Sequence, residues 1–204
     1  MSCSPLPMMT PPSGLAGRTA APADDDRLTR LAMVARDGRP DDVEAFVRAV
    51  YGDVRRFAAY LAGIPAAEDL TQETFLRVLG SLPGFAGRSS ARTWLLSIVR
   101  RVVVDRFRAA AVRPVVAELP DWQAAAERCQ PRDVPGPEEG VALADLLLQL
   151  PFERREAFVL TQVSRLSYAE AAELIGCPVG TVRSRVARAR GQLVEALLAA
   201  DQAA

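Results

Sequence analysis

Residues 166–185 read LSYAEAAELIGCPVGTVRSR, and this stretch has the parts of a helix-turn-helix. Ser167 is a typical N-cap residue, and Glu170 follows it at the spacing of a capping box. Gly176 comes directly after the last apolar position, where a helix commonly ends in a left-handed residue, and Pro178 cannot continue the helix. The stretch therefore predicts a short capped helix, a turn and a second helix.

The second helix, expected over 179–198, has two unlike faces when successive residues are placed about 100° apart. The apolar face, which would pack on the domain, consists of Val182, Val186, Ala189 and Leu193. The outward side is small and basic, which permits close approach to a major groove, neutralisation of phosphates and contact of arginine with guanine. The residues expected to bind DNA are Thr181, Arg183, Ser184, Arg185 and Arg188. The alternative is a solvated basic helix.

The rest of the chain is patterned as helices interrupted by Pro and Gly. Apolar periodicity predicts helices from 24, from 40, and over 66–79, 91–108, 141–150, 154–163 and 168–175. Five prolines and an excess of acids between the two helical groups indicate an extended linker, whose Trp122 either packs on a domain or anchors the linker in a partner. We expect an all-α fold of two small domains, divided into a disordered leader (1–24), a first domain (25–108), a linker (109–140) and a second domain (141–200).

Composition excludes several classes of function. The chain has no histidine, and Cys3, Cys129 and Cys177 form no CxxC pair, so we expect no catalytic constellation, no metal site, no disulfide and no cofactor. The net charge is zero and all 25 basic residues are arginine, so DNA binding requires charges that are segregated along the chain. No apolar run approaches the ~18 to 20 residues that a membrane span needs. These features are typical of a cytoplasmic protein that is not an enzyme.

The segment 67–79 combines a predicted buried side with an unusual outward side. Phe75, Val78, Leu79 and Leu70 fall towards one side of the helix. The other side carries Asp69, Gln72 and Glu73 with Leu76 among them. An apolar side chain within an acidic and polar face is typical of a protein-docking surface, although a solvated helix with one exposed leucine has the same pattern.

The segment 85–108 is basic and contains an aromatic residue within a polar stripe. The stripe recurs at spacings of three and four along the predicted helix and consists of Trp94, Ser97, Arg101, Asp105 and Arg108. A Gly/Ser/Arg loop precedes this helix. Such a surface can hold a single strand or an unstacked base. The alternative interpretation is that Trp94 fills the core and the arginines cover it.

Together these segments resemble the extracytoplasmic-function (ECF) sigma factors of bacteria. Three motifs carry the resemblance: residues 68–76 (EDLTQETFL), residues 92–96 (RTWLL) with Ile98 and Asp105, and residues 166–185. The variant of the first two motifs looks most like the actinobacterial C-type members. The resemblance covers about residues 28–198 apart from the linker.

The resemblance implies partners and roles for particular residues. The β′ and β subunits of core RNA polymerase and promoter DNA would be the partners, and an anti-sigma factor is a further candidate. The polymerase-docking residues would be Asp69, Gln72, Glu73 and Leu76. The −10 DNA would be bound by Arg88, Ser89, Arg92, Trp94, Ser97, Arg100, Arg101 and Asp105. The helix that begins at Val179 would read the −35 element through the five residues named above.

One departure from the family affects the −10 surface. Many members carry Asn where this chain has Arg101, and an arginine reaches a phosphate more readily than it reads a base. The competing function is a stand-alone helix-turn-helix regulator, which would use the same C-terminal motif without polymerase. Such a regulator is expected to have a ligand pocket or a dimer seam in its first domain.

Overall fold

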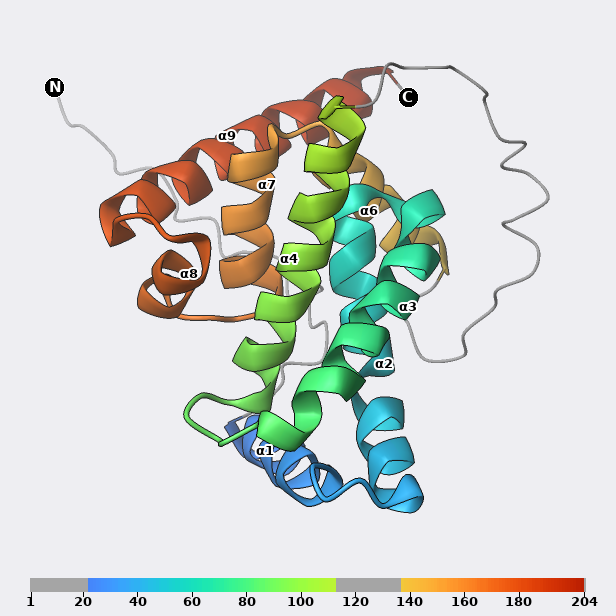
Figure 1. Ribbon diagram of the computed structural model, residues 1–204. Coiled ribbons are helices and arrows are strands. Elements are labelled where there is room, and N and C mark those ends of the chain that lie inside the picture. Colours follow the sequence, from blue (N-terminus) through green and yellow to red (C-terminus); the bar gives the residue numbers. More distant parts are fainter. Residues whose placement is uncertain (1–21, 113–136, 204) are drawn as a thin grey trace, which may run out of the picture.

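The structure, a computed structural model, describes residues 22–112 and 137–203. Nearly all of the expected leader and most of the expected linker, including Trp122, lie outside the described residues, as do Cys3 and Cys129. The described residues form helices and the turns that join them, in agreement with the predicted all-α class (Figure 1).

The N-terminal domain is built from four α-helices and a short 3-10 turn. In chain order these are α1 (Pro22–Ala35), α2 (Pro40–Ala62), α3 (Ile64–Ser81), η1 (Leu82–Gly84) and α4 (Ala91–Val112). Pro40 occupies the first turn of α2, which Asp41 and Asp42 follow, as expected for a helix start. Helix α3 begins earlier than predicted, at Ile64, because Pro65 is tolerated in a first turn that needs no amide hydrogen there.

The C-terminal domain contains the predicted helix-turn-helix preceded by two further helices. Its elements are α6 (Pro137–Leu148), α7 (Phe152–Phe158), η2 (Val159–Val163), α8 (Tyr168–Ile175) and α9 (Val179–Ala203). The helix expected over 154–163 is α-helical only to Phe158, and the next five residues form a π turn. Helix α6 begins before the predicted start at Val141.

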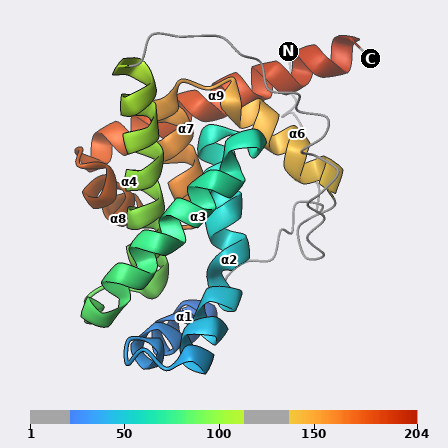
Figure 2. The ribbon, with the colours of Figure 1, turned by 45° about the vertical axis from the view of Figure 1, so that its right-hand side comes forward.

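The two domains pack against each other and share one buried apolar cluster. Helix α6 packs on α2, and both ribbon views place α4 beside α7 (Figures 1 and 2). Leu148 approaches the corner at Gly63 between α2 and α3, and the ring of Phe107 meets that of Phe152 edge to face at 5.1 Å. Helix α9 lies at the end of the molecule opposite α1 (Figures 1 and 2).

No helix in the described ranges, 22–112 and 137–203, has both the length and the apolar character needed to cross a membrane.

Candidate nucleic-acid and protein interfaces

The helix-turn-helix is fixed by caps at both ends of α8. The amide of Glu170 donates to Ser167 Oγ at 3.2 Å, and the amide of Ser167 donates to the Glu170 carboxylate at 2.9 Å, so the capping box is confirmed. Gly176 ends the helix with φ 80° and ψ 40°, and its amide donates to the carbonyl of Ala172 at 2.8 Å. The conformation at Gly176 is the left-handed one that glycine adopts without strain.

Helix α9 has the two faces that its periodicity predicts. Val182, Val186 and Ala189 are fully buried in the core, and Leu193 packs partly against it. The exposed or half-exposed residues on the other side are Thr181, Arg183, Ser184, Arg185 and Arg188. All five DNA-binding candidates therefore lie on the accessible part of one helix that follows a capped turn.

Arg183 has a specific neighbour on this surface. Its guanidinium carbon lies 5.8 Å from the centre of the Tyr168 ring, which belongs to the first turn of α8. Such a cation–π contact restricts where the guanidinium can point and leaves its hydrogen-bond donors available. The contact links the two helices of the motif through a residue that is a DNA-binding candidate.

The outward face of α3 is acidic with an apolar centre. Leu76 is 70% exposed, and Asp69, Gln72 and Glu73 are exposed around it. Leu79, which was expected on the buried side, is 43% exposed, so that prediction is wrong.

The reason for the error at Leu79 is that the buried stripe of α3 is centred elsewhere. It includes Thr71 and Thr74, whose hydroxyls donate to the backbone carbonyls four residues earlier at 2.7 and 2.6 Å. These bonds satisfy the hydroxyls within the helix and allow threonine to occupy core positions. The covered stripe therefore runs through these residues to Val78 and leaves Leu79 at its edge.

Ion pairs connect this acidic face to the basic helix α4. Arg77 donates to Glu73 on its own helix and to Asp105 on α4, both at 2.8 Å. Hydrogen bonds to Asp105 and Glu73 raise the pKa of Arg77. Asp105, a −10 candidate, is thus already paired with an arginine, and Asp69 lies 4.0 Å from Arg106.

The loop before α4 exposes two of the candidate residues and buries its ends. Arg88 and Ser89 are exposed, whereas Phe85 is buried and its ring lies 4.9 Å from that of Trp94. Trp94 is half-buried and packs against the core, as the core-filling interpretation expects, but it is not fully covered. Ser90 Oγ accepts a hydrogen bond from the amide of Thr93 at 3.1 Å and so caps the start of α4.

Further along α4, the other −10 candidates differ in exposure. Arg101 and Asp105 are exposed, and Ser97 is half-buried with its hydroxyl donating to the carbonyl of Trp94 at 2.6 Å. Arg100 points instead to the C-terminal domain, where its Nε donates to Glu156 at 2.7 Å. Arg100 is therefore an interdomain contact in this arrangement, which sequence periodicity did not indicate.

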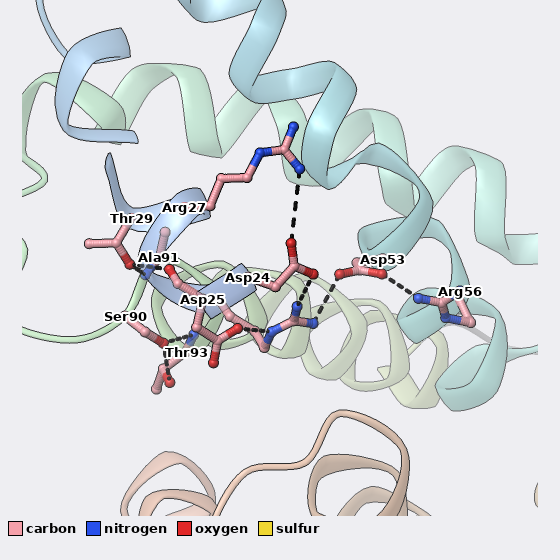
Figure 3. Close-up of polar contacts among 10 residues, drawn as sticks. Asp24, Asp25, Arg27, Thr29, Asp53, Arg56, Ser90, Ala91 and Thr93 are labelled. Atoms are coloured by element: carbon pink, nitrogen blue, oxygen red, sulfur yellow. Dashed lines mark hydrogen bonds and ion pairs between the residues drawn. The ribbon is translucent and has the colours of Figure 1, made fainter. Parts of the chain in front are cut away.

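Arg92 is surrounded by carboxylates rather than facing outward. Its side chain is 12% exposed and contacts Asp25, Asp53 and Asp24 from α1 and α2 (Figure 3). Burial opposes its charge, but the bonds to Asp25 and Asp53 outweigh that effect and raise the pKa of Arg92.

Two ionisable residues of α7 were not indicated by the sequence. Glu156 is 2% exposed, and burial raises its pKa although Arg100 acts in the opposite direction. Burial lowers the pKa of the neighbouring Arg155, whose guanidinium lies 5.7 Å from the ring of Phe152. Only the polar positions of Glu156 and Arg155 on an otherwise apolar helix face could have suggested these contacts.

Comparison with known proteins assigns both domains to one family. Residues 46–113 match the family model of sigma-70 region 2, and residues 140–193 match that of sigma-70 region 4. The probable RNA polymerase sigma-C factor of Mycobacterium bovis is 47% identical over 178 residues, which is 86% of this chain and 94% of that protein. The ECF sigma factor EcfG of Rhodopseudomonas palustris is 37% identical over 174 residues, which is 84% of this chain and 91% of that protein.

Solved structures agree with this relationship. The sigma factor RpoE from Bartonella quintana, in complex with the anti-sigma factor NepR, is similar with a TM-score of 0.59 and 28% identity, covering 76% of this chain and 96% of that one. CnrH, in complex with the cytosolic domain of CnrY, gives a TM-score of 0.60 and 28% identity, covering 87% of this chain and 99% of that one. The chain therefore belongs to the ECF group of the sigma-70 family of RNA polymerase sigma factors.

Proposed function

We propose that this chain binds core RNA polymerase and carries it to promoters, where it recognises the −10 and −35 elements and supports promoter opening. The observation that carries the proposal is the presence of two unlike surfaces in one chain. Helix α9 presents an exposed basic face after a capped turn, and α3 presents an acidic face centred on Leu76. A DNA reader that acts alone has no need of the second surface.

The polymerase-docking surface would be Asp69, Gln72, Glu73 and Leu76 on α3. Its acidity suits a basic partner, and the exposed leucine offers an apolar anchor at its centre. The core subunits β′ and β are the expected partners. The ion pairs of Arg77 and Arg106 would hold this surface in a fixed relation to α4.

The promoter-binding surfaces would lie on the two domains, over residues 25–108 for the −10 element and 141–200 for the −35 element. The exposed −10 candidates are Arg88, Ser89, Arg101 and Asp105, with Trp94 and Ser97 beside them. Arg100 would join them once its pair with Glu156 opens. The −35 element would be read by Thr181, Arg183, Ser184, Arg185 and Arg188.

The protein would act by binding, without catalysis of its own, and in the cytoplasm, where the polymerase lies. An anti-sigma factor is a further proposed partner, supported by the complex in which the similar RpoE was solved. A partner of that kind would have to engage one of the surfaces above to block polymerase or DNA.

The decisive test is run-off transcription from genomic DNA fragments with purified core polymerase, with and without this chain, followed by mapping of the start sites. We expect new transcripts whose start sites share upstream elements at −10 and −35. Transcription that does not depend on the chain, together with duplex DNA binding in the absence of polymerase, would favour the stand-alone regulator instead.

A further inference from the structure

The Arg92 cluster, which consists of Arg92, Asp24, Asp25 and Asp53, joins three helices at the base of the loop 85–90. Arg92 lies in the first turn of α4, and its Nε donates to Asp25 of α1 at 2.5 Å while Nη1 donates to Asp53 of α2 at 2.9 Å. Asp24 lies 3.9 Å from Nη2. Figure 3 shows these carboxylates converging on one point between the helices. A guanidinium held by several carboxylates in fixed directions orients the helices that carry them.

Arg92 also lines a small cavity. Arg92 and Asp53 line a cavity of about 40 Å³ whose other walls include Leu28, Leu95 and Ser164. Ser164 belongs to the C-terminal domain, so residues of both domains line this cavity. The cavity has room for a few water molecules but not for a nucleobase. Because 12% of its side chain is exposed and its nitrogens are bound by carboxylates, Arg92 offers little surface to a DNA strand in this arrangement.

A second contact ties the start of α4 to α1. The amide of Ala91 donates to Thr29 Oγ1 at 3.0 Å, and the same hydroxyl donates to the carbonyl of Asp25 at 2.8 Å. The first amide of a helix has no partner within the helix, so Thr29 of α1 serves as a cap from another element. Helix α1 thus holds both the backbone and the first charged side chain of α4.

The loop itself rests on α1 as well. Gly87 adopts φ +66°, and a Cβ at this position would lie 3.3 Å from the sulfur of Met33. A side chain here would be strained by the backbone conformation and crowded by α1. The exposed residues Arg88 and Ser89 follow directly, so their position depends on how the loop is seated on α1.

We infer that Arg92 is a positioning residue that holds the loop 85–90 in the shape that binds the −10 strand, and that it does not itself contact DNA. The inference rests on the proposed promoter recognition by this loop. In this role Arg92 and Thr29 act together: the arginine fixes the direction of α4, and the threonine fixes its first turn. Helix α1, which precedes the matched region 2 segment, thereby becomes part of the structure that binds the −10 element.

The positioning role and a direct DNA contact predict opposite effects when a carboxylate is neutralised. Asp25→Asn removes a charge that pairs with Arg92 but leaves the arginine in place. If Arg92 contacts DNA, this change frees its guanidinium and promoter binding stays the same or strengthens. If Arg92 positions the loop, the change loosens the cluster and promoter binding weakens.

The experiment measures how holoenzyme, assembled from the full chain and core polymerase, binds a fluorescent promoter fork as a function of salt. The fork is built from a start site mapped by run-off transcription and has a single-stranded −10 strand joined to a −35 duplex. The variants are Arg92→Met, Asp25→Asn and Thr29→Val, with Thr29→Ser as the conservative rescue. Glu44→Gln, which neutralises an exposed carboxylate paired with Arg48 on α2, is the matched control.

We expect Arg92→Met, Asp25→Asn and Thr29→Val each to weaken fork binding about tenfold, because each removes a hydrogen bond or ion pair of a partly covered cluster. The salt slope should stay at the wild-type value because no phosphate contact is lost. Thr29→Ser and Glu44→Gln should bind like wild type, and binding of the isolated −35 duplex should be unchanged throughout. If Arg92→Met does not fold, the comparison of Thr29→Val with Thr29→Ser still tests the inference.

Two results overturn the inference. One is undiminished fork binding by Asp25→Asn and Thr29→Val. The other is a weakened Arg92→Met whose salt slope falls by about 1, the signature of a lost phosphate contact. Failure of the wild-type holoenzyme to bind the fork contradicts the proposed function itself, so the two failures are distinguishable.

Discussion

Arg100 of α4 and Glu156 of α7 form an ion pair across the domain boundary, with Nε 2.7 Å from the carboxylate oxygen. Glu156 is almost fully covered, whereas Arg100 keeps 21% of its side chain exposed. The guanidinium of Arg100 also lies 3.5 Å from the carbonyl oxygen of Ile175, at the end of α8. One arginine of the first domain thus contacts both the core and the helix-turn-helix of the second.

Loss of Arg100 alone should destabilise the protein more than loss of both members of the ion pair. Arg100→Met leaves the covered carboxylate of Glu156 without its hydrogen-bond donor, and we expect the free energy of unfolding to fall by about 3 kcal/mol. Urea denaturation at neutral pH measures the change. The double variant Arg100→Met/Glu156→Leu should recover most of the loss, because an apolar pair leaves no charge buried. A double variant that is less stable than Arg100→Met would contradict this account.

Packing of the two domains should weaken as the pH rises above 4.5, the ordinary pKa of a glutamate side chain. Burial raises the pKa of Glu156 above its usual 4.5, so the packed state holds this proton more tightly than an opened or unfolded one. The contribution of Glu156 is therefore most favourable below about pH 4.5 and is lost as the pH rises through the raised pKa. Glu156→Gln, which cannot ionise, should gain stability relative to wild type as the pH rises. Melting temperatures of the two proteins between pH 4.5 and 8 test this, and parallel curves would refute it.

The capping box of α8 should contribute measurably to the stability of the helix-turn-helix. Ser167→Ala removes the acceptor for the Glu170 amide, and we expect a loss of about 1 kcal/mol. Ser167→Thr retains a capping hydroxyl and serves as the control. Chemical denaturation gives the loss, and hydrogen exchange of α8 amides locates it. Equal stability of the alanine and threonine variants would show that the cap contributes little.

Arg188 should contribute to −35 binding through charge. Arg188→Ala is expected to weaken binding of −35 duplex and to lower the slope of log K against log salt by about 1, if the side chain pairs one phosphate. Fluorescence anisotropy over a salt series measures both quantities. Arg48→Ala on α2, which removes the same charge from an exposed ion pair, should leave the slope unchanged. An unchanged slope for Arg188→Ala would assign that residue to the solvated face.

The acidic face of α3 should be needed for polymerase association and not for duplex binding. The triple change Asp69→Ala, Gln72→Ala and Glu73→Ala is expected to abolish co-purification with core polymerase while −35 duplex binding survives. Asp41→Ala with Asp42→Ala removes two acids from the start of α2 and is the charge-matched control. Retained co-purification of the triple variant would disprove the docking surface.

The elements that the sequence predicted well are those with local causes. The capping residues of α8 and the apolar stripe of α9 act over one or two helical turns, and both are present as expected. The partners of Arg92 and Arg100 were not predictable, because Asp25, Asp53 and Glu156 lie 67, 39 and 56 residues away along the chain. Periodicity shows which side of a helix is polar but does not show which distant group meets it. The π turn after α7 has no local signal either.

Gly87 lies close to Met33 of α1. This contact determines how long a segment must be if the −10 loop is to be exchanged between related proteins. The matched region 2 segment begins at residue 46, after α1, and therefore leaves out the helix on which the loop rests. In a chimera that takes only residues 46–113 from a donor protein, the donor's loop would pack against α1 of the recipient protein. Transfer of promoter preference by domain grafting should therefore use a junction upstream of residue 22, and residues 33 and 87 should be exchanged as a pair.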